Sequence, residues 1–185
     1  MILFAALLCV GQAPASVEGV ETPNPPPGFA TLFNGQDLDG WRGRPHLEPG
    51  SEASYKPKHR ETRQAEWNVD RDTHWRVENG ELANDGQGVF LTTAEDYADF
   101  DLRLEYKTVA LADSGIYLRG VPQVQIWDWT EDGGKWKLGA DKGSSGLWNN
   151  QKFESFPLKK MDRPFGEWNS LRILMTGARV SVWMN

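Results

Sequence analysis

A strict two-residue alternation over residues 99–108 constrains the fold of this chain more than any other feature of its sequence. Every second position holds an apolar or aromatic side chain, namely Phe100, Leu102, Leu104 and Tyr106. The positions between them hold charged side chains. Successive side chains of a strand point to opposite faces of its sheet, so one face of this segment is apolar and the other is charged. The pattern predicts a β-strand that packs one face against a core.

Short runs of β-branched and aromatic residues, separated by glycine, asparagine and aspartate, fill the chain from residue 28 onward. This pattern is typical of an antiparallel all-β domain, and the pairs Asn79-Gly80 and Thr176-Gly177 are typical of hairpin turns. Further strands are predicted at residues 74–77, 81–83, 89–92, 115–119, 123–128, 170–175 and 180–184. We expect two stacked sheets, and we expect the strands at 99–108, 115–119 and 123–128 to be neighbours in one of them.

The domain organisation follows from local composition. An apolar run at residues 2–10 and the small-x-small pattern Ala13-Pro14-Ala15 predict a signal peptide at residues 1–15, with export to the periplasm or the medium. Residues 16–28 are rich in proline and predict an extended linker, and residues 29–185 then form one β-sandwich domain. The last predicted strand enters a turn that the sequence does not complete, so we expect a sandwich truncated at its C-terminus.

The polar segment 45–71 differs from the rest of the predicted domain. It is dense in charge and shows no alternation of apolar and polar residues. Because it lacks the pattern of a strand, a short helix is predicted at residues 61–67.

Charge and motif content exclude several classes of function. The net charge of −6 leaves no basic stripe to neutralise a phosphate backbone, so nucleic acid is not an expected partner. The sequence has no nucleophile elbow, P-loop or dinucleotide fingerprint, and no apolar run long enough for a transmembrane helix. Its histidines lack the spacing of a zinc site. A divalent cation held by Asp128 or Asp141 is the one cofactor left open, and the sequence does not indicate an oligomeric state.

Two clusters of polar and aromatic residues are candidate sites. The first lies on and beside the predicted strands between residues 99 and 128: Arg103, Glu105, Asp113, Ser114, Tyr117, Arg119, Gln123, Gln125 and Asp128. The second is the glycine-rich loop 127–151: Trp127, Trp129, Trp136, Trp148, Asp141, Lys142, Asn149 and Asn150. Such groups supply the hydrogen bonds and stacking faces that bind sugars. They are equally typical of the solvated face of a sheet and of a packed surface loop, so both interpretations stay open.

A series of motifs, in order along the chain, makes this sequence similar to a known family. The motifs are Leu32-Phe33-Asn34-Gly35, Leu38-Asp39-Gly40-Trp41, Gly43-Arg44-Pro45-His46-Leu47, Asp113-Ser114-Gly115-Ile116-Tyr117-Leu118-Arg119-Gly120, Gln123-Val124-Gln125-Ile126-Trp127-Asp128 and Gly146-Leu147-Trp148-Asn149-Asn150. On these residues the chain resembles the 3-keto-disaccharide hydrolase family, in particular its planctomycete-like branch. The resemblance covers residues 28–185 and implies a concanavalin A-like jelly-roll β-sandwich.

The resemblance also implies an enzyme that cleaves the glycosidic bond of a 3-keto-glycoside or 3-keto-disaccharide. In such a sugar the C3 hydroxyl is already oxidised to a ketone, which acidifies the proton on C2. A base removes that proton, the resulting enolate expels the group on the anomeric carbon, and water then adds to the product.

Residues of the two clusters are assigned to these steps. Asp128 is the candidate base, Arg119 and Gln125 are candidate anchors of the enolate and the hydroxyls, and Glu105 or Asp113 is a second carboxylate that protonates the leaving oxygen or binds a cation. Predicted substrate contacts are Tyr117, Gln123, Gln125, Trp127, Trp148 and Lys142. Two other interpretations remain: a non-catalytic lectin-like carbohydrate-binding module, and a conventional glycosidase with two carboxylates.

Overall fold

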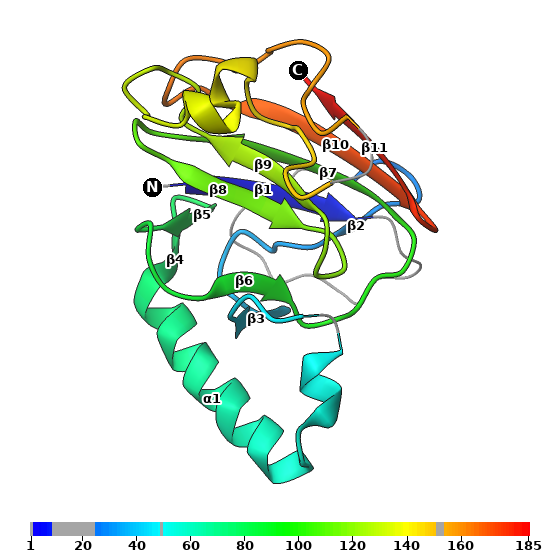
Figure 1. Ribbon diagram of the computed structural model, residues 1–185. Helices are drawn as coiled ribbons and strands as arrows, with labels where there is room; N and C mark the ends of the chain where they lie inside the picture. Colours follow the sequence, from blue (N-terminus) through cyan, green and yellow to red (C-terminus); the bar gives the residue numbers. More distant parts are fainter. Residues whose placement is uncertain (1, 9–24, 49, 151–153) are drawn as a thin grey trace.

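The computed structural model of the protein describes residues 2–8, 25–48, 50–150 and 154–185. Most of its regular structure is strand (Figure 1). The strands are β1 (Ile2–Leu8), β2 (Ala30–Thr31), β3 (Trp41–Arg44), β4 (Trp75–Glu78), β5 (Glu81–Asn84), β6 (Phe90–Thr93), β7 (Phe100–Lys107), β8 (Asp113–Tyr117), β9 (Gln123–Trp127), β10 (Asn169–Thr176) and β11 (Arg179–Met184). The helices are α1 (Pro57–His74) and the short 3-10 helices η1 (Ser51–Ser54), η2 (Trp136–Leu138) and η3 (Ala140–Lys142).

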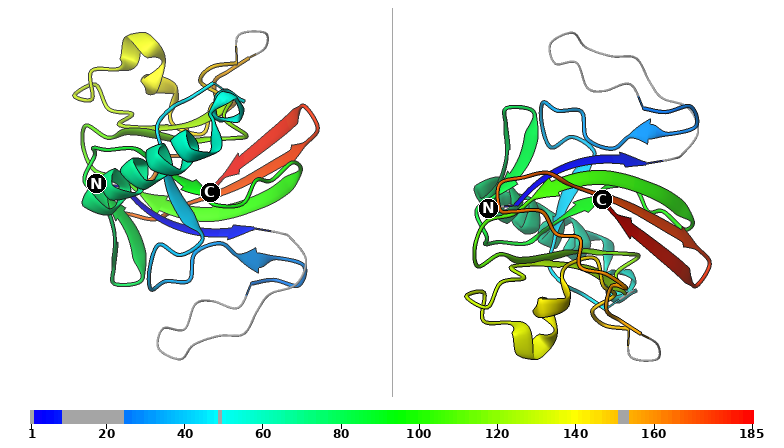
Figure 2. Two further views of the ribbon diagram at one scale, coloured as in Figure 1. Left: turned by 90° about the horizontal axis from the view of Figure 1, so that it is seen from below. Right: turned by 90° about the horizontal axis from the view of Figure 1, so that it is seen from above.

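The strands form one large sheet and two small ones. The large sheet has the order β11-β10-β7-β1-β5-β4, with β2 paired to β1, and its long strands are visibly curved (Figure 2). The small sheets are the pairs β3–β6 and β8–β9. The predicted hairpin turns are confirmed: Asn79 and Gly80, with φ of 54° and 78°, connect β4 to β5, and Gly177, with φ of 57°, lies between β10 and β11. All of these pairings are antiparallel.

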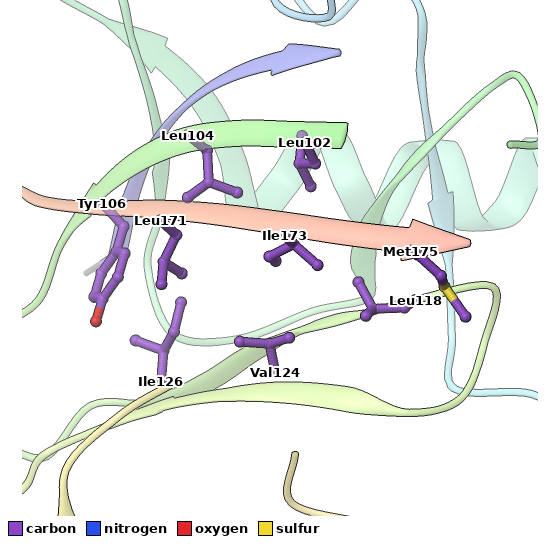
Figure 3. Packing of buried hydrophobic residues seen from close by; sticks show 9 residues of the cluster. All are labelled: Leu102, Leu104, Tyr106, Leu118, Val124, Ile126, Leu171, Ile173 and Met175. Atoms are coloured by element: carbon purple, nitrogen blue, oxygen red, sulfur yellow. The ribbon is translucent and has the colours of Figure 1, made fainter. Parts of the chain in front are cut away.

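The core lies between the large sheet and the β8–β9 hairpin (Figure 3). Leu102, Leu104 and Tyr106 point into it from β7, and Val124 and Ile126 meet them from β9. Further members of the cluster are Leu118, Leu171, Ile173 and Met175. Two sheets packed through one apolar layer confirm the predicted all-β sandwich and the predicted buried face at residues 99–108. The jelly-roll connectivity stays a prediction.

One sequence-based expectation about the sheets is wrong. The strands at 115–119 and 123–128 do pair with each other, as β8 and β9, but β7 belongs to the opposite sheet. Both edges of β7 are occupied, by β10 and by β1, so β8 and β9 meet β7 through side chains rather than through backbone hydrogen bonds. Alternation in a sequence identifies the buried face of a strand, and it carries no information about which strand lies beside it.

Strand β1 lies between β5 and β7 and pairs with both. It falls within the predicted signal peptide, whose residues 9–15 lie outside the described residues together with most of the predicted linker. Cleavage of the leader therefore stays a prediction. In the part of the chain that the structure describes, no helix is long and apolar enough to cross a membrane.

Helix α1 is longer than the predicted segment 61–67, which it contains. It begins with a proline in its first turn, where the missing N–H has no intrahelical partner to lose, and none of its described residues is buried. It lies at the opposite end of the molecule from β10 and β11 and packs beside β3 (Figure 1). Because α1 has no apolar stripe, the usual periodicity of a helix gives no signal for its length.

The contact between α1 and β3 is made by polar side chains. Asn68 Oδ1 accepts a hydrogen bond from Gly43 N at 3.0 Å, and Gln64 Nε2 donates to Gly43 O at 2.9 Å. Arg71 donates to Trp41 O at 2.5 Å. These three residues lie four and three positions apart, on one face of the helix. Their side chains satisfy the backbone groups on the free edge of β3 and so protect that edge.

Candidate functional site

A cleft of about 1810 Å³ opens between the β3–β6 pair, strand β8 and the concave side of the large sheet. Its apolar lining includes Leu82, Leu102 and Leu104 of the large sheet. Its polar lining includes residues of β3, η1, α1, β8 and β9 and of the segments that follow β3, β6 and β8: Arg42, Arg44, His46, Glu52, Glu61, Gln64, Asn68, Glu95, Asp96, Asp113, Ser114, Tyr117, Arg119 and Gln123. An apolar floor with convergent polar groups is the usual form of a small-molecule site.

Three aromatic side chains from separate segments meet on the wall of this cleft. The imidazole of His46 stacks on the phenol ring of Tyr117, with ring centroids 4.5 Å apart and planes inclined by 25°. Phe90 lies 5.4 Å from Tyr117 and 6.2 Å from His46, measured between ring centroids. We call these three residues the ring stack. Burial, and to a lesser degree the nearby Asp113 carboxylate, raises the pKa of the Tyr117 phenol, so that it stays a hydrogen-bond donor.

Beside the ring stack, two arginines share one carboxylate. Glu52 pairs with Arg42 at 3.0 Å and with Arg44 at 2.5 Å, and Arg42 also donates to Gln64 Oε1 at 3.1 Å. Burial acts to raise the pKa of Glu52, but the hydrogen bonds and charges of the two arginines outweigh it and leave that pKa below its ordinary value. Because two guanidinium groups face one carboxylate, this group of three residues is positively charged as a unit. We call Arg42, Arg44 and Glu52 the arginine pair and its carboxylate.

On the β8 side of the cleft the polar residues are joined by hydrogen bonds and an ion pair. Gln125 is buried, and its amide nitrogen donates to Asp113 Oδ1 at 2.9 Å and to Ser114 O at 3.0 Å. Asp113 also forms an ion pair with Lys135. Gln125 is thus a support for the Asp113 carboxylate, whereas Asp113 itself borders the cleft.

Asp128, the predicted base, is only 1% exposed. Its Oδ2 accepts a hydrogen bond from Leu111 N at 2.7 Å, and its Oδ1 accepts from Thr130 N at 2.8 Å and from Thr130 Oγ1 at 2.6 Å. Burial opposes ionisation, but these hydrogen bonds are stronger in effect and lower the pKa of Asp128. The carboxylate therefore joins two loops, and Asp128 is not among the residues that line the cleft.

The remaining predicted site residues lie in several places. Asp113, Tyr117, Arg119 and Gln123 line the cleft together. Glu105 is exposed on the face of β7 opposite the core, away from β8 and β9. Arg119 has a φ of 52° and donates a hydrogen bond to Gly177 O. The structure therefore brings part of the first predicted cluster together and separates Glu105 and Asp128 from it.

The glycine-rich loop 127–151 bridges β9 through Leu147, which pairs with Val124, and none of its described residues lines the cleft. Trp127 is buried, donates to Gly143 O at 2.9 Å and meets Trp148 edge-on at 5.5 Å between ring centroids. Trp148 is 41% exposed, and Lys142 is paired with its neighbour Asp141 at 2.7 Å. For Trp127 the packing interpretation is the better supported one, because its ring and its N–H are both engaged inside the domain.

Sequence reasoning missed the part of the cleft wall that comes from β3, the segment after it, η1 and β6. Arg42, Arg44, His46, Glu52 and Phe90 were not singled out as site residues. One signal was available for Arg44 and His46, since both lie in the motif Gly43-Arg44-Pro45-His46-Leu47, where one polar residue ends a strand and another follows it. No local signal could show that this segment folds against Tyr117, which is far away in the sequence.

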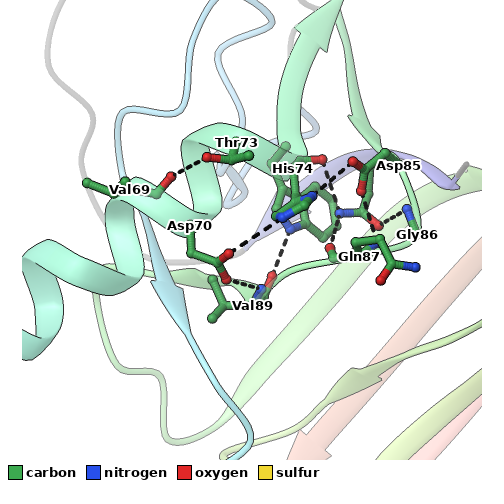
Figure 4. A network of polar contacts seen from close by, with 10 residues as sticks. Val69, Asp70, Thr73, His74, Asp85, Gly86, Gln87 and Val89 are labelled. Carbon is green, nitrogen blue, oxygen red and sulfur yellow. Dashed lines mark hydrogen bonds and ion pairs between the residues drawn. The ribbon is translucent and has the colours of Figure 1, made fainter.

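A second polar network lies outside the ring stack, at the end of α1 (Figure 4). The His74 ring contacts Asp85 Oδ2 at 2.9 Å and Asp70 Oδ1 at 3.5 Å, and Asp70 Oδ2 accepts from Val89 N at 2.8 Å. A side chain on Gly88 would come within 2.5 Å of the His74 ring. These contacts fasten the helix to the turn between β5 and β6, which explains them without a ligand.

Across the described ranges, no group of three or more His, Cys, Asp and Glu side chains is placed to hold a metal ion. Asp128 and Asp141, the predicted cation ligands, are engaged with N–H donors and with Lys142. The cation stays a prediction, and the chemistry proposed below relies on side chains of this chain.

Comparison with known proteins adds two findings. Residues 28–185 match the family described as 3-keto-alpha-glucoside-1,2-lyase-like domain. A similar protein is a 3-keto-disaccharide hydrolase of Bacteroides thetaiotaomicron, which is 22% identical over 191 residues. That alignment covers 87% of this chain and 57% of the relative, so the chain spans a little over half the length of the protein it matches.

Proposed function

The chain belongs to the family of 3-keto-alpha-glucoside-1,2-lyase-like domains, and from this premise we propose that it cleaves the glycosidic bond of 3-keto-glycosides in the cleft beside the ring stack. The family and its relative support glycoside cleavage in a coarse sense. The reaction and the residues that carry it are our proposal. The observation that supports them best is the position of the ring stack next to the arginine pair, within one cleft.

The proposed reaction has three steps. A base removes the proton on C2, and the electron pair of that C–H bond moves toward the C3 ketone to form an enolate. The ketone re-forms as the bond between C1 and the aglycone oxygen breaks, which leaves a C1–C2 double bond and an aglycone that takes up a proton. Water then adds its hydroxyl to C1 and its proton to C2, so the net reaction is hydrolysis. No oxocarbenium ion is required, unlike in an ordinary glycosidase.

The cleft offers complementary surfaces for these steps. Aromatic faces bind the C–H face of a sugar ring, and Tyr117 and Phe90 are placed to do so. The net positive charge of Arg42 and Arg44 over Glu52 would stabilise negative charge on the enolate oxygen, at a partly buried site where such charges act strongly. Asp113 and the Tyr117 hydroxyl are candidates for contact with the leaving oxygen.

A lectin-like binding module is the alternative. The observation that favours it is that Glu52 and Asp113, two carboxylates that line the cleft with the ring stack, are both held in ion pairs. A binding module needs no free base. It predicts that 3-keto sugars and their unoxidised parents bind without being consumed.

Solvent deuterium distinguishes the proposed mechanism from direct displacement. We expect that a 3-keto-glucoside turned over in heavy water yields a free 3-keto sugar with deuterium on C2, because the C2 proton is lost and then regained from solvent. A sample of the substrate without protein corrects for spontaneous exchange. Product that keeps its C2 proton would exclude the elimination step, and no product at all would favour the binding module.

Export also belongs to this proposal, because the apolar run at residues 2–10 followed by Ala13-Pro14-Ala15 is typical of a cleaved leader. A 3-keto-glycoside would then be cleaved in the periplasm or the medium. N-terminal sequencing of the protein recovered from each cell fraction tests this, and an intact leader on cytoplasmic protein would contradict it.

A further inference from the structure

His46 differs from the other histidines in what its ring nitrogens contact. Both nitrogens of His74 face carboxylates, and His59 Nε2 accepts a hydrogen bond from Arg63 at 3.3 Å. The imidazole of His46 is exposed, and within the described residues neither of its nitrogens has a hydrogen-bond partner. It is therefore a side chain whose capacity to take up or donate a proton is not used by the fold.

The ring stack holds this imidazole in a defined orientation. A stacked contact uses the faces of the two rings, whereas the nitrogens of an imidazole bind protons and hydrogen-bond partners in the plane of the ring. With planes inclined by only 25° at 4.5 Å, Tyr117 supports one face of His46 and leaves the edge of the ring open to the cleft. Orientation by the fold, rather than by a bound ligand, is what a pre-organised proton-transfer group needs.

The charged groups that line the cleft with His46 come from several elements, and they include Glu61 of α1 and the exposed Glu95 and Asp96 that follow β6. Arg44 of β3 and Glu52 of η1 are paired with each other, Asp113 of β8 is paired with Lys135, and Arg119 follows β8 and donates to Gly177 O. The carboxylates of Glu52 and Asp113 are thus occupied by cations. Within the ring stack, the imidazole of His46 combines a nitrogen lone pair that no hydrogen bond among the described residues uses with an exposed position in a defined orientation.

We infer that His46 is the base that removes the C2 proton, an inference that rests on the function proposed above. The proton moves to one ring nitrogen, the electron pair of the C–H bond passes toward the C3 oxygen, and the imidazolium that forms lies against the aromatic face of Tyr117. A cation over an aromatic face is stabilised by the negative charge density of that face. The imidazolium then holds the proton that the departing aglycone oxygen requires, so one residue serves both proton transfers.

The test uses the chain of residues 1–185 and its variants His46→Phe and His46→Gln. Phenylalanine retains an aromatic ring for the stack and cannot take up a proton. The matched control is His59→Phe, since the ring of His59 also contacts a tyrosine, with its centroid 5.0 Å from that of Tyr55 and the planes tilted by 39°, but on the exposed helix α1. Steady-state kcat and KM for a 3-keto-glucoside are measured across pH for all proteins.

We expect kcat of both His46 variants to fall by about 100-fold or more, as loss of a general base does, while KM changes by less than about threefold. The wild-type rate should decrease toward acid pH, where an imidazole is protonated, and this limb should be missing in the variants. The His59→Phe protein should behave as the wild type.

Two outcomes would overturn the inference, and they are distinguishable. If the wild type releases aglycone and His46→Phe retains kcat within about threefold with the same pH profile, His46 is not the base although the proposed function holds. If the wild type releases none from any 3-keto-glucoside, the proposed function fails and this inference fails with it.

Discussion

The two walls of the cleft are small two-stranded sheets that are held in place by different forces. The β8–β9 wall is anchored by apolar burial, with Val124 and Ile126 both at 0% exposure against the large sheet. The β3–β6 wall is anchored by hydrogen bonds from Gln64, Asn68 and Arg71 of a helix that buries none of its described residues.

The geometry of the site depends on both walls. The ring stack takes Tyr117 from the apolar wall, and Phe90 and His46 from the polar wall and the segment that follows it. A cleft assembled from both walls depends on the weaker anchorage as much as on the stronger. Apolar packing should therefore dominate the stability of the domain, whereas the polar contacts of α1 should control the geometry of the cleft.

The largest effect is expected from Ile126→Ala. The substitution removes fully buried apolar volume between the sheets and should lower the free energy of unfolding by about 2–5 kcal/mol. Urea unfolding followed by tryptophan fluorescence measures the loss. Val69→Ala on α1 is the control, because Val69 is 69% exposed and its truncation should change little. Equal losses in the two variants would contradict the assigned location of the core.

Gly43→Ala should have the next largest effect. An added Cβ would lie 2.1 Å from the carbonyl oxygen of Trp67, so the helix and the strand have to separate. We expect a loss of about 2 kcal/mol, as for other overpacked sites, together with weaker binding of sugar in the cleft. Calorimetric titration and unfolding of the same sample measure both. Unchanged binding would mean that the β3–β6 wall does not shape the cleft.

A smaller loss is expected for Asn68→Ala. Its amide oxygen accepts hydrogen bonds from Gly43 N and, at 2.8 Å, from Gln64 Nε2, so truncation leaves the donor on β3 without its partner. The free energy of unfolding should fall by about 1 kcal/mol. Arg63→Ala, on the exposed face of the same helix, should be close to neutral. If Asn68→Ala and Arg63→Ala lower the free energy of unfolding equally, the contact of Asn68 with β3 makes no specific contribution to stability.

The smallest expected effect is the loss, at acid pH, of the stability that Glu52 contributes through its ion pairs with Arg42 and Arg44. The pKa of Glu52 is lower in the folded protein than its ordinary value of 4.5, so its contribution is complete above that value and is lost as the pH falls through the lowered pKa. The contribution should be below about 1 kcal/mol, because the pair is partly exposed. Comparing wild type with Glu52→Gln at pH 7 and pH 3 measures it. A difference in the free energy of unfolding between the two proteins that is larger at pH 3 than at pH 7 would contradict this prediction.

The fold was predictable where one physical rule acts locally. Alternation identified the strand at residues 99–108 and the glycine-containing turns identified hairpins, because each depends on a few adjacent residues. The partner of β7 was not predictable, since β8 and β9 contact it only through side chains from the opposite sheet. The length of α1 was not predictable either, because a helix held by Gln64, Asn68 and Arg71 has no apolar period.

In the site, too, the residues that could be predicted are those with a local signal in the sequence. Tyr117, Asp113 and Gln123 could be chosen because polar and aromatic residues alternate with core residues on β8 and β9. Asp128 had the right chemistry, but its hydrogen bonds to Leu111 N and Thr130 exist only in the folded loops. The contact of His46 with Tyr117 joins segments that are brought together by the fold alone.

The central claim is that the cleft cleaves glycosides only when the sugar carries a C3 ketone. Its most direct test is the rate of aglycone release from a 3-keto-glucoside and from its unoxidised parent, with the chain of residues 1–185 and with its variant Tyr117→Ala. We predict release from the keto sugar alone, and a lower rate in the variant, because the ketone is what acidifies C2 and Tyr117 forms part of the ring stack. Equal release from both sugars would contradict the claim and point to a conventional glycosidase.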